Sequence, residues 1–459
     1  MTLADTLEPV LAGPVPPARP PSLLKAMSMA ADDQLAMFPQ GAYEQPIFEL
    51  NGFGRFILVN DPAAIKAVLL DRVENYPKHP KEQEALGDLF GEGILTSDGD
   101  KWRSHRKIMS PAFDLRSLKA YAPRMAATTE GWMSGWDSLP DGAAIEAQAA
   151  MTHLTLQIIA GTAFSGDVGH MTDLVGRTFN AAGEKLDFSL VDILPVVGPW
   201  RRAERRRAIR AVFAELDAEI ARLVASRAAR QGDAQPDLLS RLVGARDPDT
   251  GLGMTAAEVR DEVVTIFVAG HETTAVAMTW IWYLLAQHPA EEAWLHAELD
   301  EGLGGRAPTY EDLARLPYTR WVVEEAMRLY PPAPGLSTRV ALAPDTLAGK
   351  TIPKGAMVGI MPWVLHRHRD LWDQPLRFDP ERFSPESSAG RHRYAYLPFG
   401  GGPRVCIGTA MAMNEAMIIL ATLAQRFRLR LAPDAVVEPQ ARITLRPRYG
   451  MPMRLERRR

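Results

Sequence analysis

The stretch Tyr396–Glu415 reads YLPFGGGPRVCIGTAMAMNE and contains Cys406, the only cysteine among 459 residues. Three consecutive glycines, 400–402, allow positive φ angles and a close approach of the backbone to a bulky partner. Pro403 stiffens the chain just before the cysteine. The loop is therefore suited to wrapping around a sulfur atom that contacts a large group.

The residues after Ile407 follow a helical apolar pattern with no helix breaker before Gln425. Cys406 is therefore expected at a helix N-terminus, where the helix dipole and the charge of Arg404 would stabilise a thiolate. A stabilised thiolate acts either as a nucleophile or as a metal ligand. The alternative is an ordinary small buried thiol in a glycine loop.

The pattern Phe399-x-x-Gly402-x-Arg404-x-Cys406-x-Gly408 resembles the heme-binding loop of the cytochrome P450 family at every marked position. The resemblance implies that Cys406 is the axial ligand of a heme iron, with Phe399 and Arg404 beside the cofactor. A thiolate ligand pushes electron density onto the iron and favours cleavage of the O–O bond. Further landmarks of the family can then be sought along the chain.

Composition is that of a globular protein, with 46% hydrophobic and 24% charged residues. A net charge of −4 gives no reason to expect nucleic acid as a partner, and one cysteine excludes an internal disulfide or a multi-cysteine metal cluster. This cysteine usage fits a cytoplasmic location. The first residues lack a basic start followed by an apolar core, so neither a signal peptide nor a membrane anchor is predicted.

Residues 1–37 are rich in proline and are predicted to form an extended arm. Residues 38–459 are predicted to form a single domain, mainly α-helical with small β-sheets, whose β-rich part covers about 38–75 and 338–380. By the resemblance this is the cytochrome P450 fold, with a long central helix over the heme and the cysteine loop beneath it.

Two local patterns near the start predict regular structure. The segments 47–50 and 55–59 read as short strands around Asn51-Gly52, a dipeptide typical of tight hairpin turns. Asp61 is predicted to cap the next helix, with Pro62 at its first position.

Trp102 and Arg106 lie one helical turn apart on the same predicted face. Alone, they could be a surface tryptophan beside a solvated basic cluster. Together with the cysteine loop, they resemble the family's propionate-binding pair, in which Trp102 would donate its indole N–H and Arg106 would pair with a carboxylate. Arg339 falls where the family often directs another arginine to a heme propionate.

A helix of about 33 residues, roughly 50 Å long, is predicted from the capping box Thr255-x-x-Glu258 to Pro289. Polar residues at its centre would be expensive in lipid, so a buried central helix is favoured over a membrane span. Gly270 in its interior costs about 1 kcal/mol relative to alanine, which suggests a flat ligand lying against the backbone.

The segment Ala269-Gly270-x-Glu272-Thr273-Thr274 resembles the oxygen-activating helix of the same family. In that family the acid and the threonine relay protons to bound dioxygen, so Glu272 and Thr273 are the predicted catalytic pair. The intervening His271 is interpreted as structural. The alternative is that these polar residues only accommodate a distortion of the helix.

Glu325 and Arg328 lie three residues apart on a predicted helix, a spacing that alone is worth only a few tenths of a kcal/mol. Together with Arg382 they resemble the family's Glu-Arg-Arg cluster, which has a structural role behind the heme. The apolar loop 190–202 resembles the lid over the family's substrate entrance. The basic run that follows it is an ordinary solvated helix face unless the lid assignment holds.

The residues that the resemblance places in the substrate pocket are overwhelmingly apolar, which suggests a fatty acid, alkane, terpenoid or aromatic substrate. They are Leu89, Phe90, Ile94, Leu95, Thr265, Val268, Ala269, Ala333, Leu336, Ile443 and Thr444.

The resemblance as a whole implies a monomeric heme-thiolate monooxygenase that binds heme b, uses O2 and receives electrons indirectly from NAD(P)H. No flavin or iron–sulfur domain is recognised in the chain, so a ferredoxin or flavodoxin with its reductase is the expected electron donor. It would be steered by six cations, which are Lys101, Arg103, Lys107, Arg391, Arg393 and Arg404.

Three alternatives stay open at this point. A peroxide-driven enzyme would be expected to lack the acid and the threonine of the central helix. A cysteine hydrolase would need a histidine poised on Cys406. A non-catalytic heme sensor would bind heme through the same thiolate, and for it Glu272 and Thr273 would be dispensable.

Overall fold

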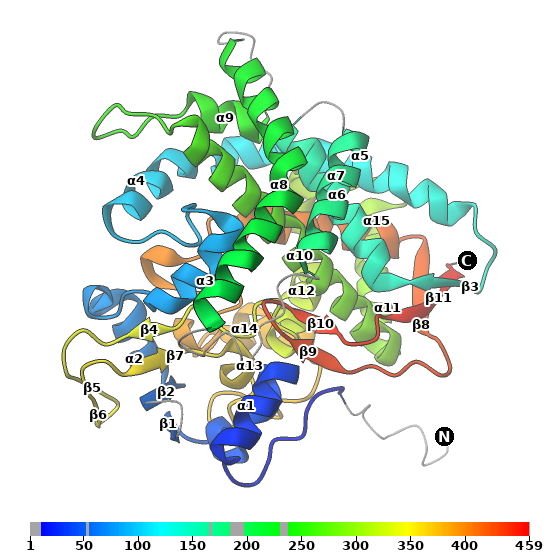
Figure 1. Ribbon diagram of the computed structural model, residues 1–459. Coiled ribbons are helices and arrows are strands. Elements are labelled where there is room, and N and C mark those ends of the chain that lie inside the picture. Colours follow the sequence, from blue (N-terminus) through cyan, green and yellow to red (C-terminus); the bar gives the residue numbers. More distant parts are fainter. Residues whose placement is uncertain (1–10, 52–54, 165–167, 184–196, 230–236, 459) are drawn as a thin grey trace. The chain divides into compact units, whose positions relative to one another are not determined.

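The computed structural model describes residues 11–51, 55–164, 168–183, 197–229 and 237–458 (Figure 1). The chain forms two compact units. The first contains residues 1–79, 125–154 and 272–459, and the second contains residues 80–124 and 155–271. Along the chain, one boundary between them falls inside a single long helix, after His271.

The first unit combines small sheets with helices. Its strands are β1 (Ile47–Asn51), β2 (Arg55–Val59), β3 (Ala143–Glu146), β4 (Arg339–Val340), β5 (Asp345–Leu347), β6 (Lys350–Ile352), β7 (Met357–Gly359), β8 (Phe427–Leu431), β9 (Pro439–Ala441), β10 (Leu445–Pro447) and β11 (Pro452–Arg457). Its helices are α1 (Leu23–Asp32), α2 (Pro62–Lys66), α11 (Pro289–Leu303), α12 (Pro317–Leu329), α13 (Pro362–Leu365), α14 (Pro385–Ser388) and α15 (Thr409–Ala424).

The second unit is helical among its described residues. It holds α3 (Pro80–Phe90), α4 (Gly99–Met109), α7 (Val168–Gly183), α8 (Val197–Ala229) and α9 (Leu238–Gly244). Parts of α5 (Leu115–Asp137), α6 (Ala147–Phe164) and α10 (Ala256–Gln287) also belong to it. The prediction of a mainly helical protein with small β-sheets is confirmed.

The largest sheet has the order β1-β2-β7-β4, with β1 antiparallel to β2 and β2 parallel to β7 (Figure 1). The predicted hairpin strands are confirmed as β1 and β2. The predicted cap is confirmed too, because the Asp61 side chain accepts a hydrogen bond from the Ala64 N–H, with Pro62 at the start of α2. Apolar residues of this sheet and of α2 form one buried core, including Ile57, Ile65 and Val358.

The prediction of an extended arm over residues 1–37 is wrong for its second half. Residues 11–22 contain no helix, but α1 begins at Leu23, two residues after the last proline of the arm. Proline is excluded from a helix interior because it lacks an N–H and clashes with the preceding turn, and this constraint ends where the prolines end. The single-domain boundaries themselves stay a prediction.

The long helix is confirmed as α10, whose 32 residues run from Ala256 to Gln287. Its capping box is formed, since the Thr255 N–H donates to Glu258 Oε2 at 2.9 Å and the Glu258 N–H donates to Thr255 Oγ1 at 3.3 Å. Pro289 opens the next helix, α11. Among the described residues, no helix combines the length and the apolar character needed to cross a bilayer.

A buried ion pair ties α12 to the chain that precedes the cysteine loop. Arg328 donates to both carboxylate oxygens of Glu325, at 2.6 and 2.8 Å, and both side chains are fully buried. Its other donors reach the carbonyls of His366, Pro375 and Arg377 at 2.7–2.9 Å. All five N–H groups of this guanidinium are therefore satisfied.

The third member of the predicted cluster lies at the same carboxylate. Arg382 approaches Glu325 Oε1 at 3.5 Å, and the Asp379 N–H donates to the same oxygen at 2.9 Å. Glu325 thus receives two guanidinium groups and a backbone donor, which offsets the cost of burying its charge.

Replacing Arg328 by methionine should lower the free energy of unfolding by about 3–5 kcal/mol, because Glu325 and three carbonyls would lose buried partners. The matched control is Arg320→Met on the same helix, where the exposed guanidinium lies 3.3 Å from Glu324. That surface pair should contribute about 0–1 kcal/mol. Denaturant unfolding followed by circular dichroism would measure both, and equal losses would contradict the assigned role of Arg328.

Candidate active site

The cysteine loop is closed by a backbone hydrogen bond. The Cys406 N–H donates to the Phe399 carbonyl at 2.9 Å, and the Thr409 hydroxyl donates to the Cys406 carbonyl at 2.8 Å. Cys406 is exposed and lies three residues before the first residue of α15. The exposed Cys406 therefore follows a turn that is closed by a hydrogen bond, and it lies just before a helix N-terminus, as predicted.

The glycines of the loop have different tasks. Gly400 and Gly402 adopt φ angles of 73° and 67°, as expected, whereas Gly401 is extended, so positive φ was wrong for that residue. A Cβ atom on Gly402 would lie 1.9 Å from the Leu69 carbonyl oxygen. The close approach that requires glycine at 402 is thus to the protein's own backbone.

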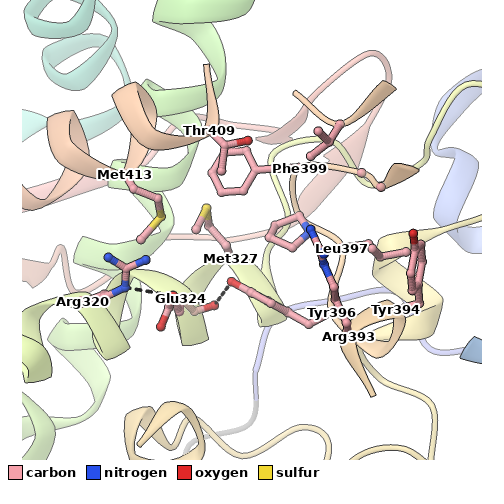
Figure 2. A pocket seen from close by; sticks show the side chains of 14 residues that line it. Arg320, Glu324, Met327, Arg393, Tyr394, Tyr396, Leu397, Phe399, Thr409 and Met413 are labelled. Atoms are coloured by element: carbon pink, nitrogen blue, oxygen red, sulfur yellow. Dashed lines mark hydrogen bonds and ion pairs between the residues drawn. The ribbon is translucent and has the colours of Figure 1, made fainter. Parts of the chain in front are cut away.

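A pocket lies against this loop, and its lining residues come from α12 and residues 393–413 (Figure 2). Phe399 and Thr409 lie on one side of it and Met327 on another (Figure 2). The Tyr396 hydroxyl donates to the Glu324 carbonyl at 2.7 Å and so joins the loop's start to α12. Arg320 and Arg393, both exposed, also line the pocket.

The predicted acid of the central helix has partners that the sequence analysis did not identify. Glu272 Oε1 accepts a hydrogen bond from the Thr444 hydroxyl. The same oxygen forms an ion pair with Arg446, whose Nη2 lies 2.6 Å from it. Thr444, which was predicted to line the substrate pocket, contacts the acid, and its place in the pocket stays a prediction. The sequence offered one signal for Arg446 as a partner of this acid, which is its position as a cation two residues after Thr444.

The middle of α10 presents one opened face in an otherwise buried helix. Ala269 is exposed and Gly270 and Thr273 are half-buried, whereas Val264 and Phe267 on the preceding turns are buried. A Cβ atom on Gly270 would come within 3.3 Å of the Ile159 side chain. Packing against α6 is therefore a second reason for glycine at this position.

His271 is structural, as interpreted from the sequence. It is buried, its Nδ1 lies 2.6 Å from the Phe267 carbonyl, and its own carbonyl accepts a hydrogen bond from Thr155. Both interactions stay within the second unit.

The predicted propionate-binding residues lie on a helix, a strand and the cysteine loop. Trp102 and Arg106 are half-buried on α4, and the predicted helix there is confirmed. Arg339 is only 6% exposed and begins strand β4, and Arg404 is half-buried in the cysteine loop. Their role toward a propionate stays a prediction.

The predicted pocket residues differ in exposure. Phe90, Thr265 and Thr444 are buried, Ile94, Val268, Ala333 and Leu336 are half-buried, and Leu95, Ala269 and Ile443 are exposed, while the side chain of Leu89 lies outside the described residues. The predicted lid lies largely outside the described residues, at 190–196. Its extension to residue 202 is wrong, because α8 begins at Val197 and accommodates Pro199 in its first turn.

Four of the six cations predicted to attract an electron donor have other engagements. Lys101, Arg103 and Lys107 form ion pairs with Glu92, Asp100 and Asp249, respectively. Arg391 donates to the Arg382 carbonyl and lies 4.5 Å from the ring centroid of Trp372. These pairs reduce the positive field of the predicted patch.

A buried histidine connects α4 with α10 in the second unit. His105 Nδ1 lies 2.6 Å from Glu262 Oε1, and its Nε2 lies 3.5 Å from Glu258. Glu262 is fully buried, and its other oxygen accepts the Ile94 N–H at 3.0 Å. This arrangement anchors the loop that carries the predicted pocket residues Ile94 and Leu95.

The second unit holds that loop closely as well. A Cβ atom on Gly91 would lie 2.3 Å from the Asp261 carboxylate, and one on Gly93 would lie 2.7 Å from the Thr265 hydroxyl. Asp261 also accepts the Glu92 N–H at 2.9 Å. Two carboxylates of α10 therefore determine the path of the chain through residues 91–94.

A thiolate-bound heme needs an accessible sulfur and N–H donors for its propionates. Both kinds of group occur in the first unit, which carries the exposed Cys406 and the guanidinium of Arg339. Among the described residues, no group of three or more His, Cys, Asp or Glu could hold a metal ion. The exposed Cys406 thiol fits heme iron, because the porphyrin itself supplies most of the ligands of that iron.

Comparison with known proteins decides the family. Residues 28–451 match the family described as "Cytochrome P450". This chain belongs to the cytochrome P450 family. It is therefore a heme-dependent oxidoreductase of the monooxygenase type, and the cysteine-hydrolase alternative is wrong.

Three similar proteins illustrate the relationship. Cyclooctatin synthase of Streptomyces melanosporofaciens is 36% identical over 84% of this chain and 83% of its own length. Cyclooctat-9-en-7-ol 5-monooxygenase of the same organism is 35% identical over 76% of this P450 and 75% of its own length. The crystal structure of the cytochrome P450DA heme domain superimposes with a TM-score of 0.84 at 27% identity, covering 98% of this chain and 99% of that one.

His105 should make the stability of this P450 depend on pH. Burial lowers the pKa of His105, but its hydrogen bond to Glu262 and the charges of Glu262 and Glu258 outweigh this, so the pKa lies above its usual value of about 6.5. The stabilisation is therefore complete below about pH 6.5 and is lost as the pH rises through the folded-state pKa.

The measurement compares the unfolding free energy of wild type and His105→Gln at about pH 6 and pH 9. The advantage of wild type should shrink toward the higher pH. His170→Gln, at an exposed position of α7, is the control and should show no such change. An advantage that is constant with pH would contradict a charged His105.

Proposed function

We propose that this P450 binds heme b through Cys406 and uses O2 to hydroxylate or epoxidise a lipophilic small molecule of the terpenoid type. Its electrons would come from NAD(P)H through a separate ferredoxin or flavodoxin and its reductase. The observation that carries the proposal is the exposed Cys406 thiol in a loop closed by the Phe399–Cys406 hydrogen bond. The cytoplasmic location and the monomeric state expected from the sequence belong to the same proposal.

When bound, the heme supplies the activation of dioxygen and the insertion of one oxygen atom into the substrate. The Cys406 sulfur would hold the iron. Arg339 would bind a propionate through charge-assisted N–H donors, and the family resemblance gives the same role to Trp102 and Arg106. Phe399 and Arg404 would lie on the cysteine side of the cofactor.

Proton delivery falls to Glu272 and Thr273. Both Thr444 and Arg446 bind Glu272 at Oε1, and among the described residues no donor is bonded to Oε2. Oε2 is thus the oxygen on which this carboxyl can carry a proton. The Thr273 hydroxyl, half-buried on the next residue, can accept a proton on one side while donating on the other.

The terpenoid assignment rests on two kinds of support. The relatives described above are named for cyclooctatin and cyclooctat-9-en-7-ol, which are terpenoids. Several predicted pocket residues of the second unit are apolar and half-buried or buried, among them Phe90, Ile94 and Val268. Such a lining favours a bulky hydrocarbon skeleton over a polar metabolite.

The electron donor would meet this P450 beside the cysteine loop. Because Lys101, Arg103 and Lys107 are already ion-paired, the exposed Arg393 at the pocket of Figure 2 is a better candidate for its contact. An acidic partner would be steered there by opposite charge.

The reduced protein with carbon monoxide should give the red-shifted Soret band of a thiolate-bound carbonyl complex, and Cys406→His should abolish it. The difference spectrum of dithionite-reduced samples with and without carbon monoxide measures this directly. Thr409→Val, which removes only the hydroxyl donated to the Cys406 carbonyl, serves as control and should keep the band. A wild type without heme, or with a histidine-like band, would overturn the proposal.

Thr273→Ala should keep the thiolate carbonyl band but lower coupling, so that more reducing equivalents are lost per product formed. A loss of roughly 10²-fold in coupled rate is typical of removing one proton-transfer group. The loss of coupling is tested by measuring product and peroxide in a reaction that contains O2, a surrogate electron-donor system and cyclooctat-9-en-7-ol as the probe substrate. Unchanged coupling would contradict the proposed role of Thr273 and would instead favour the peroxide-driven alternative.

A further inference from the structure

A fully buried histidine lies beside the start of the cysteine loop in the fold, although the two are distant in the sequence. His366 follows α13 and has no exposed surface. Its Nε2 lies 2.8 Å from the backbone nitrogen of Leu397. Since a backbone N–H can only donate, Nε2 is the acceptor and the ring proton is on Nδ1.

The surroundings keep this imidazole neutral. Burial, together with the charges of Arg328 and Arg367, lowers the pKa of His366 well below its usual value. The ring lies 5.1 Å from that of Tyr396 and 6.3 Å from that of Trp372, measured between centroids. The acceptor is therefore available over the whole physiological pH range, and the ring has one tautomer.

Leu397 lies at the start of the cysteine loop, directly after Tyr396. Its carbonyl accepts the Gly400 N–H at 3.1 Å, which forms the glycine turn. Phe399, inside that turn, supplies the carbonyl that accepts the Cys406 N–H at 2.9 Å. A displacement of Leu397 is thus transmitted through two backbone hydrogen bonds to the residue that bears the thiol.

His366 is itself held by the buried ion pair of α12. Arg328 Nη1 donates to the His366 carbonyl at 2.8 Å, and the His366 N–H donates to the Pro362 carbonyl at 2.9 Å. His366 therefore binds Arg328 of the buried ion pair through its backbone carbonyl. Through its ring it holds the start of the cysteine loop.

We propose that His366 is a positioning residue for the Cys406 thiolate, acting by accepting the Leu397 N–H and so setting where the loop begins. The proposal rests on the heme-thiolate function proposed above. Removing the acceptor would leave a buried N–H without a partner, a cost that the chain can relieve only by moving Leu397 toward water or toward another acceptor.

The test compares His366→Phe, which keeps an aromatic ring but has no acceptor, with His366→Gln, whose Oε1 can accept the same hydrogen bond. Leu365→Ala is the matched control, because it creates a cavity at the adjacent fully buried residue without touching the Leu397 N–H. All three are expected to lose stability, so stability does not distinguish them.

Two readouts distinguish positioning from a merely structural role. The first is the ratio of non-thiolate to thiolate carbonyl bands at equal heme content, which should rise roughly tenfold in His366→Phe and return toward wild type in His366→Gln. The second is the pH profile of iodoacetamide alkylation in the heme-free protein, where the only cysteine, Cys406, reports its own environment. It should shift in His366→Phe alone.

The proposal would be overturned if His366→Phe kept the carbonyl-band ratio and the alkylation profile of the wild type. It would also be overturned if Leu365→Ala changed these two readouts as much as His366→Phe does. Should His366→Phe fail to fold, hydrogen exchange of the Leu397 amide in His366→Gln decides instead, and full protection there supports the acceptor role while its loss opposes it. Failure of the proposed function is separate, because it appears as a missing thiolate band in the wild type, whereas the alkylation profiles still judge His366.

Discussion

The five hydrogen bonds of the Arg328 guanidinium are the constraint on which the first unit depends. Two go to the buried Glu325 carboxylate and three go to carbonyls between His366 and Arg377. A guanidinium is always charged and offers five donors in a rigid plane. Burying it therefore requires a hydrogen-bond acceptor for each of its N–H groups. The segment that leads to the cysteine loop is thereby given a fixed path before any cofactor contacts it.

The cysteine loop inherits its shape from this path. Tyr396 is bonded to the Glu324 carbonyl and Leu397 to His366, and Gly402 fits against the Leu69 carbonyl with no space for a side chain. The protein part of the heme site is therefore preorganised by packing and backbone hydrogen bonds. Preorganisation of this kind is what the proposed role of Cys406 as the ligand of the heme iron requires.

The central helix combines two electrostatic environments. In the second unit, Glu262 is buried against His105 and holds the loop at Ile94. In the first unit, Glu272 is only partly buried and is engaged by Arg446. One carboxylate thus shapes the loop that carries predicted pocket residues, while the other is the acid of the proposed proton relay. The difference between them comes from the partners that each contacts.

What the sequence predicted well was local. The capping box of α10, the hairpin strands β1 and β2 and the Asp61 cap all join residues within a few positions of one another, so periodicity and side-chain chemistry are sufficient. The extended arm failed at α1 because proline content indicates where a helix cannot form, but not where it resumes. The cysteine motif identified the family because its spacing is itself a local geometric requirement.

What only the tertiary structure decided is which distant residues share a hydrogen bond. Glu272 and Arg446 are 174 positions apart, His105 and Glu262 are 157 apart, and His366 and Leu397 are 31 apart. No periodicity links such pairs, because their proximity follows from the packing of whole elements and from the need to satisfy every buried polar group. The sequence by itself therefore determined the family and the long helix and predicted the ligand cysteine, whereas the fold decided which distant residues are their hydrogen-bond partners.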